Sequence, residues 1–299
     1  MRKQKEEEEE EEEARLKSSV VMLFITKTKT VKNNTIFYSI QHKKTVFMNT
    51  TRVVGRYITL SRRLRSRHRL QSSSSMTSQG GISSDHRAEY ILEFWLGESW
   101  KSASTWDPLS TTENSQKWFG KSEELDTTIR QEFGQDVDLL ETTYRMSWNK
   151  MYNADASLEE CLAYIILGDQ MCRNMYRGSK DMYRADALTL PLSKHLVANG
   201  HLRSMSLPMM FFTLLPLMHS EDVEDQKECV RVFQELLQEA QQDNHEAAES
   251  FLTQVVSYAK SHEDVVATYG RFPHRNGILG RSNTPEEEQG FAQGTIPSF

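Results

Sequence analysis

Residues 209–218 read MMFFTLLPLM and are apolar on every side of the helix that they predict. Pro208 suits the first turn of this helix, because a backbone N–H at that position would have no partner within the helix. A helix without a polar face must be covered on all sides by other parts of the protein. We therefore expect this segment to be the central helix of the fold.

Outward from this helix, the chain carries apolar residues at helical spacing. Ala88, Ile91, Leu92 and Trp95 follow the i, i+3, i+4, i+7 pattern of a buried helical face. From Ser84 onward, strand patterns are nearly absent. Further helical stripes fall within residues 125–133, 158–166, 185–196, 223–237 and 251–266. The sequence therefore predicts an all-α fold, either a multi-helix bundle or a solenoid-like array of antiparallel helix pairs.

Helix ends are also marked in the sequence. Ser157 and Glu160 have the spacing of a capping box, and so do Thr284 and Glu287. Gly270 follows a long helical pattern and suits the left-handed conformation that often ends a helix. These signals predict helices that begin after residues 157 and 284 and one that ends at residue 269.

Charge divides the chain into two parts. Residues 1–76 hold 17 Lys and Arg against 8 Asp and Glu, whereas residues 77–299 hold 19 against 34. The second part is therefore strongly acidic, which argues against nucleic acid as a partner, because nucleic-acid binding requires a basic face. Its length suits one or two conventional hydrophobic cores, and we assign residues 77–299 to one all-α domain.

The three cysteines, Cys161, Cys172 and Cys229, have no CxxC spacing, and their number is odd. A disulfide framework or a zinc site would need a different pattern. The composition therefore favours a reducing compartment, and we expect the protein to be cytoplasmic.

The first 76 residues lack the pattern of a folded domain, and we expect a disordered extension. Glu6–Glu13 is an unbroken acidic run, which repels itself and stays solvated. Val20–Ile25 is apolar but far shorter than the ~20 residues that span a bilayer, so we expect no membrane span. Residues 48–75 are Arg-rich, free of acidic residues and amphipathic, as in mitochondrial transit peptides. If Met48 is the true start, the protein is mitochondrial; the alternative is a basic tail before a cytosolic protein that begins at Met76.

Three stretches place polar side chains where the helical pattern predicts apolar ones. The first, residues 169–178, directly follows an apolar run, and Asp169 shares a helix face with Arg173, four residues on. The second, residues 215–222, ends the apolar helix, and the third, residues 269–281, holds too much Gly and Pro for a simple helix. The candidate functional residues are Asp169, Arg173, Asn174, Arg177, His219, Glu221, Arg271, His274, Arg275, Asn276 and Arg281.

These stretches have two interpretations. In the first they form one pocket, in which the arginines and asparagines bind an anionic group. His219 or His274 then moves a proton, with Asp169 and Glu221 as catalytic carboxylates. In the second, the arginines hold the helices together through bidentate ion pairs with carboxylates. Because a buried ion pair gains little over apolar packing, the number of arginines favours a site.

The sequence shows only weak patterns for a metal site or a catalytic nucleophile. His219, Glu221 and Asp222 match no strong metal-binding spacing, and we predict no metal site. Ser220 and Cys172 lack the partner spacing of a catalytic nucleophile. The sequence identifies no cofactor.

Five ordered motifs resemble the family of domain of unknown function 924. They are FWLGE (94–98), KWFGKSEELDTTIRQEFG (117–134), ILGDQMCRNMYRG (166–178), LPLMHSED (215–222) and YGRFPHRNGILGRSNTPEE (269–287). The resemblance covers residues 84–299 and implies an all-α fold similar to tetratricopeptide-repeat proteins, without an established activity. The family's third motif resembles LDQFPRNIYRG, and here Gly168, Met171 and Cys172 replace three of its residues. Without the proline, we expect the helix there to end less abruptly.

Two functions remain open at this point. The first is binding, with hydrolysis as an extension, of a small anionic ligand between the arginines, with a histidine as acid or base. The second is a tetratricopeptide-like scaffold that binds a protein partner along a groove, with the Arg, His and Asp motifs as a structural network.

Overall fold

The computed structural model describes residues 28–32, 35–39, 84–152, 157–297 and 299. It divides into a smaller unit (residues 1–57 and 110–121) and a larger one (residues 58–109 and 122–299). Every regular element among the described residues of the larger unit is helical, which confirms the all-α prediction for this part of the chain. The Arg-rich segment 48–75 lies outside the described residues. The comparison with tetratricopeptide repeats and the disordered extension stay predictions.

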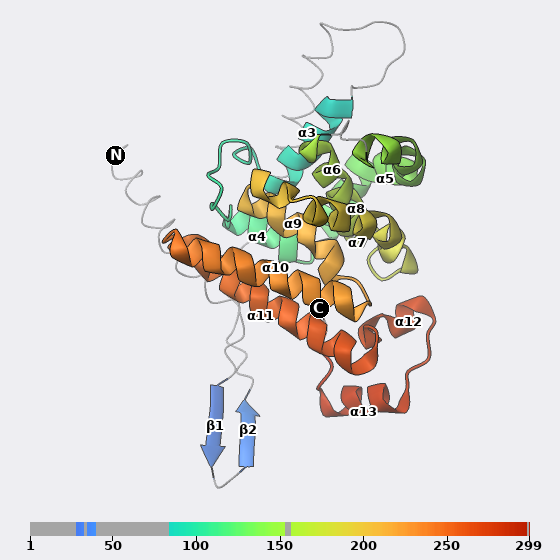
Figure 1. Cartoon of the computed structure of the whole chain (residues 1–299). Coiled ribbons are helices and arrows are strands. Elements are labelled where there is room, and N and C mark those ends of the chain that lie inside the picture. The colour runs from blue at the N-terminus through green and yellow to red at the C-terminus, as the bar shows by residue number, and fades with distance from the viewer. Residues whose placement is uncertain (1–27, 33–34, 40–83, 153–156, 298) are drawn as a thin grey trace, which may run out of the picture. The chain divides into compact units, whose positions relative to one another are not determined.

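The smaller unit holds an antiparallel pair of strands and one helix. Strands β1 (Thr28–Lys32) and β2 (Thr35–Ser39) pair in the register Thr28 to Ser39 and Lys32 to Thr35 (Figure 1). Thr, Val, Ile, Phe and Tyr fill both strands, and these residues favour extended structure. The sequence analysis did not predict this pair. Helix α4 (Thr112–Phe119) begins at Thr111, whose hydroxyl accepts the backbone N–H of Asn114.

The larger unit contains long helices joined by short turns (Figure 1). Its α-helices are α3 (Ser84–Leu96), α5 (Glu123–Tyr152), α6 (Leu158–Ile165), α7 (Cys172–Met175), α8 (Asp186–Ala198), α9 (Leu207–Met218), α10 (Val223–Gln242), α11 (Glu246–Tyr269), α12 (Asn276–Leu279) and α13 (Pro285–Gln293). A π-helical turn, η1 (Ile166–Met171), joins α6 to α7. Three 3₁₀ turns, η2 (Lys180–Tyr183), η3 (His201–Ser204) and η4 (Pro273–Arg275), precede α8, α9 and α12.

Helix α9 lies at the centre of the larger unit, as its sequence predicts. All 12 of its residues are buried, and it packs against α6, α8, α10 and α11. Pro208 occupies its first turn. His219 directly follows the last residue of α9 and is partly buried. It therefore lies at the edge of the hydrophobic core.

Helices α10 and α11 pack side by side and position the third polar stretch (Figure 1). Gly270 ends α11 in the left-handed conformation, with φ of 67°, and its N–H donates to the Val266 carbonyl at 2.8 Å. The predicted cap is therefore confirmed, and the chain turns sharply into η4. Both predicted capping boxes, at Ser157 and at Thr284, are also present.

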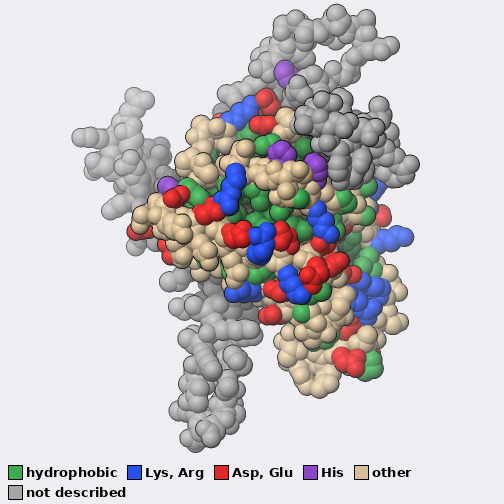
Figure 2. Space-filling model, in the orientation of Figure 1, with side chains coloured by type: hydrophobic (Ala, Val, Ile, Leu, Met, Phe, Trp, Pro, Cys, Tyr) green, Lys and Arg blue, Asp and Glu red, His purple; other side chains and the backbone are tan. Residues whose placement is uncertain are grey.

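Charged side chains on the exposed surface of α10 are paired. Lys227 contacts Glu224, and Arg231 contacts both Glu228 and Glu235. Figure 2 shows basic and acidic side chains next to one another on this face of the molecule. Such exposed pairs contribute little to stability, with a typical value of about 0.5 kcal/mol or less for pairs within one helix.

Gly168 lets the π-helical turn approach α8 closely. A Cβ on Gly168 would lie 2.6 Å from Thr189 Cγ2 and 3.1 Å from Ala185 Cβ, both on or next to the buried start of α8. We expect Gly168→Ala to lower the free energy of unfolding by about 1–3 kcal/mol, because overpacking forces the backbone or Thr189 to shift. Urea denaturation of the purified protein measures this change.

Gly134 provides a matched control, because it lies inside α5 with no atom within 4 Å of the added Cβ. Gly134→Ala should leave stability unchanged or raise it by about 0.5–1 kcal/mol, since alanine is the better helix former. Equal effects of the two substitutions would contradict the close approach at Gly168.

Candidate functional site

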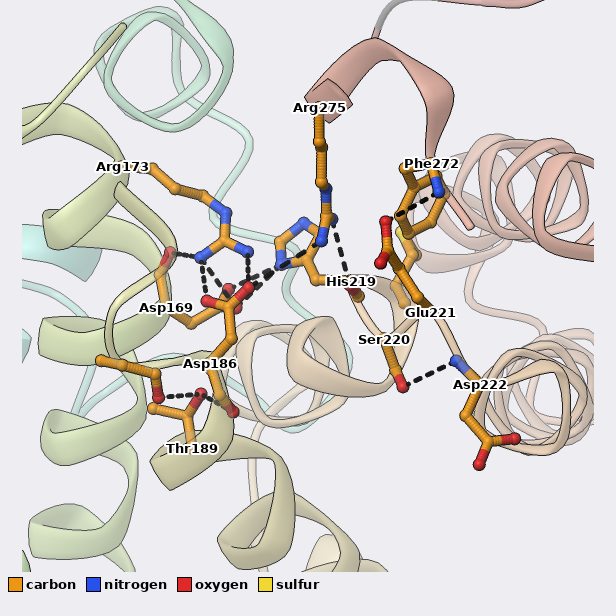
Figure 3. A network of polar contacts seen from close by, with 12 residues as sticks. Asp169, Arg173, Asp186, Thr189, His219, Ser220, Glu221, Asp222, Phe272 and Arg275 are labelled. Carbon is orange, nitrogen blue, oxygen red and sulfur yellow. Dashed lines mark hydrogen bonds and ion pairs between the residues drawn. The ribbon is translucent and has the colours of Figure 1, made fainter. Parts of the chain in front are cut away.

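Side chains from all three polar stretches meet at one cluster (Figure 3). Asp169 lies in the π-helical turn, and Arg173 follows one turn later in α7, with its Nη1 3.2 Å from Asp169 Oδ1. His219 comes from the C-terminal end of α9 and places its Nδ1 2.8 Å from the same oxygen. Arg275 reaches the cluster from η4, and its Nη2 donates to the His219 carbonyl at 3.0 Å. The predicted helix face shared by Asp169 and Arg173 is confirmed.

Asp186 completes this cluster, although the sequence analysis did not select it. It is the first residue of α8, and its carboxylate accepts two hydrogen bonds from Arg173, both of 3.0 Å. Its side chain is 27% exposed, against 16% for that of Arg173. The only sequence signal was an acidic residue at a helix start, which is too common to identify a site.

Asp169 fixes the tautomer of His219. Burial alone would raise the pKa of Asp169, but the charge of Arg173 and the hydrogen bonds from His219 and Gln170 outweigh it and hold the pKa well below its usual range. Gln170 Nε2 also donates to Asp169 Oδ2 at 2.6 Å. Because the carboxylate is ionised, His219 Nδ1 must be the donor in their hydrogen bond, and Nε2 therefore carries the lone pair.

His219 is held in its neutral form. Burial lowers its pKa, and Arg173 and Arg275 add to this effect, which outweighs the opposing influence of Asp169. Its side chain is 18% exposed, and no residue in the described part of the chain forms a hydrogen bond with its Nε2. A neutral imidazole oriented by a carboxylate, with a free lone pair near the surface, can accept a proton.

Arg275 is nearly buried but poorly paired. Only 7% of the residue is exposed, and its Nε has no hydrogen-bond partner among the described residues. The nearest carboxylate oxygen, Asp186 Oδ2, lies 4.0 Å from its Nη1 and already accepts from Arg173. The guanidinium lies over two aromatic rings. Its Cζ is 4.8 Å from the ring centroid of Tyr183 and 4.4 Å from that of Phe272. Burial and the charge of Arg173 lower its pKa.

Glu221 and Arg281 form a second cluster that secures the turn after α11. Arg281 donates to both oxygens of Glu221, at 2.6 and 2.9 Å, and Glu221 also accepts the backbone N–H of Phe272 at 2.8 Å. Burial raises the pKa of Glu221, but these donors outweigh burial and lower it. Glu221 therefore accepts three hydrogen bonds, and among the described residues it forms none with His219 or Asp169.

Arg271 and Asn276 belong to a third cluster around Glu287. Arg271 donates to both carboxylate oxygens of Glu287, at 2.6 and 2.7 Å, and Asn276 Nδ2 donates at 3.0 Å. The hydrogen bonds from Arg271 are the main cause that lowers the pKa of Glu287 to about 2. This arrangement ties α12 to the start of α13.

Asn174 and Arg177 lie apart from these clusters and pair with Asp126 on α5. Arg177 donates to both oxygens of Asp126, at 2.7 and 3.0 Å, and Asn174 Nδ2 donates at 2.8 Å. Together with the Arg271 and Arg281 pairs, this geometry matches the structural interpretation of the polar stretches. The structure thus brings four of the candidate residues together and distributes the others, apart from His274, among separate clusters around Glu221, Glu287 and Asp126.

His274 and an additional histidine, His262, both lie next to the ring of Phe272. Burial lowers the pKa of His274 to about 4, and its Nδ1 is buried without a hydrogen-bond partner in the described residues. His262 is 2% exposed, donates from Nδ1 to the Tyr258 carbonyl at 2.9 Å and stacks on Phe299 at 3.6 Å. Its ring centroid lies 6.4 Å from that of His219. The helical pattern of α11 gave no sign that His262 faces the candidate site.

Most of the chain also matches a known protein family. Residues 91–295 match the family described as bacterial protein of unknown function (DUF924). The chain belongs to the DUF924 family. The solved structure of a protein of unknown function from Agrobacterium tumefaciens is also similar, with 28% sequence identity and a TM-score of 0.54. That likeness covers 71% of this chain and all of the other. No curated protein matches.

In this DUF924 chain, the departures from the family motif lie in the π-helical turn and at its end. Gly168 allows the contact with α8, and the helix continues from the turn into α7 without a break. This continuity agrees with the expectation that loss of the proline makes the helix end less abruptly. The motif residues Asp169 and Arg173 keep their mutual contact despite the substitutions.

The described residues of this DUF924 protein contain no group of three or more His, Cys, Asp or Glu placed to hold a metal ion. Glu221 and Asp222 are used separately, since Asp222 accepts the backbone N–H of Glu224 and caps α10. Within the same residues, no helix combines the length and apolar character that crossing a bilayer requires.

Proposed function

We propose that this protein binds a small anionic ligand at the cluster formed by Arg173, Arg275 and His219. We further propose that His219, oriented by Asp169, acts on the bound ligand as a general base in hydrolysis. The other candidate arginines, Arg177, Arg271 and Arg281, then stabilise the fold that carries the site.

The incomplete pairing of Arg275 is the observation that carries this proposal. Arg173, Arg177, Arg271 and Arg281 each form two hydrogen bonds with one carboxylate. Arg275 has none, although it is the most buried of these five. A buried guanidinium without a carboxylate at hydrogen-bond distance is costly, so a fold selected for stability alone would pair or replace it. An anionic ligand would supply the missing partner.

The acid–base part of the proposal rests on the Asp169–His219 pair. The lone pair on His219 Nε2 is available, and the imidazole is neutral because its pKa is lowered by burial. A water molecule beside Nε2 would transfer a proton to it while the water oxygen forms a bond to a carbon or phosphorus atom of the ligand. The bond from that atom to its leaving group would break, and the protonated His219 would return the proton to the leaving group. The positive charges of Arg173 and Arg275 would stabilise the negative charge that develops on the ligand.

Calorimetric titration of the full chain with acetate, sulfate and inorganic phosphate tests the binding. We expect at least one of these anions to bind with Kd on the order of millimolar, and Arg275→Gln to weaken that binding by about tenfold or more. Arg231→Gln is the control, because Arg231 is an exposed arginine that contacts two carboxylates on α10. Equal binding by the wild type and Arg275→Gln would refute the proposed site.

A further inference from the structure

The charge balance of the cluster identifies the class of ligand, provided that the proposed anion site exists. We infer that the ligand is a monoanion, such as a carboxylate, and that it binds together with one proton, which Asp186 takes up. Asp186 is thus a specificity-determining residue that disfavours dianions such as phosphate or sulfate.

The cluster is formally neutral. The guanidinium charges of Arg173 and Arg275 face the carboxylates of Asp169 and Asp186, and His219 is neutral. Tyr183 and His262, which adjoin the cluster, are neutral as well, and Glu221 is compensated by Arg281. A dianion therefore gains no net attraction from the cluster over a monoanion, while the cost of removing it from water rises with the square of its charge.

Asp186 lies close enough to the proposed anion site for its carboxylate to repel a bound anion. Figure 3 shows its carboxylate beside the guanidinium group of Arg173, with that of Arg275 nearby. Its oxygen lies 4.0 Å from Arg275 Nη1, so an anion that pairs with this nitrogen comes within a few ångströms of the carboxylate. Two like charges that close repel strongly in a partly buried site. Repulsion is removed when the Asp186 carboxylate takes up a proton, and the resulting carboxyl group can donate a hydrogen bond to the ligand.

Asp186 is the carboxylate of the cluster best suited to take up this proton. Burial raises its pKa, and the charge of Asp169 adds to this effect, whereas the charge and the hydrogen bonds of Arg173 oppose it. The pKa of Asp169 is lowered instead. Of the two, Asp186 is also the more exposed, with 27% of its side chain accessible against 1% for Asp169. Protonation of Asp186 leaves the lone pair of His219 available for the proposed base role.

The test measures proton uptake during the titration of the full-length protein with acetate and with sulfate. Calorimetry in two buffers of different ionisation enthalpy gives the number of protons bound per anion. We expect acetate to bind about tenfold or more tightly than sulfate at about pH 7, with uptake of roughly one proton. The affinity for acetate should fall as the pH rises, because the proton that Asp186 takes up on binding becomes less available.

Asp186→Asn mimics the protonated side chain and isolates its role. In this variant proton uptake should disappear, and sulfate affinity should rise by about tenfold, because the cluster gains one positive charge. Asp138→Asn is the matched control, since Asp138 is an exposed carboxylate 3.6 Å from Arg184, and it should behave as the wild type. The wild-type measurement is decisive even if Asp186→Asn does not fold.

Several outcomes overturn the inference. Sulfate binding as tight as acetate binding, acetate binding without proton uptake, or unchanged uptake in Asp186→Asn each contradict it while leaving the anion site intact. Absence of binding by acetate, sulfate and inorganic phosphate alike would instead refute the proposed function, and the inference with it.

Discussion

Replacing Glu287 by alanine should lower the free energy of unfolding by about 3 kcal/mol, one of the two largest effects that we expect. Glu287 has no accessible surface, and its carboxylate accepts hydrogen bonds from Arg271, Asn276 and the backbone of Thr284. Removal of the carboxylate leaves Arg271 Nε and the Thr284 N–H without their acceptor, whereas Arg271 Nη2 and Asn276 keep their hydrogen bonds to Ser282 and Asn283. Glu287 is buried mainly by the polar groups that donate to it and less by the hydrophobic core. We therefore expect a loss of stability at the lower end of the range for a broken buried ion pair.

Chemical denaturation of Glu287→Ala beside Glu288→Ala measures this effect. Glu288 lies in the same first turn of α13 but is exposed, so its removal should cost only a few tenths of a kcal/mol through the helix dipole. Glu287→Gln should fall between the two, because it keeps an acceptor but loses the charge. If Glu287→Ala and Glu288→Ala were equally stable, the cluster around Glu287 would not contribute to stability.

Acidification from about pH 6.5 to about pH 4 should remove about 3 kcal/mol of stability through His262 alone. Burial lowers the pKa of His262 from 6.5 to about 3, so the folded protein keeps this histidine neutral while the unfolded chain takes up a proton. Stability is therefore complete above the unfolded pKa and falls as the pH drops towards the folded value. His274, whose pKa is lowered to about 4, acts in the same direction.

The slope of unfolding free energy against pH, compared between the wild type and His262→Gln, measures this contribution. The variant should be less stable at neutral pH but should lose clearly less stability on acidification. His86→Gln, which replaces an exposed histidine, should keep the wild-type slope. An unchanged slope in His262→Gln would mean that this imidazole is protonated in the folded state.

The parts of the fold that the sequence predicts are those determined by local patterns. The apolar stretch of α9, the capping boxes at Ser157 and Thr284 and the left-handed Gly270 each depend on neighbouring residues, and each is present. The pairing of β1 with β2 was missed, although both segments hold strand-forming residues. The π-helical turn was also missed; Gly168 within it lies close to Thr189 on α8, a contact that no local pattern shows.

The candidate site is only partly predictable, because ion pairing depends on partners far away in sequence. Arg173 and Arg177 are four residues apart and would share a face of a continuous helix. Helix α7 ends at Met175, and the chain then leaves helical geometry, so Arg177 turns to Asp126 instead. The partners Asp126, Asp186 and Glu287 lie 51, 13 and 16 residues from their arginines, beyond any local spacing rule.

The stability and anion response of Arg275→Gln, measured together, test the central claim most directly. If Arg275 serves a ligand, the variant should unfold with a free energy within about 1 kcal/mol of the wild type, since functional sites often reduce stability. Acetate should raise the melting temperature of the wild type and leave that of the variant unchanged. A loss of about 3–5 kcal/mol, with the same acetate response in both proteins, would show instead that Arg275 is a structural residue.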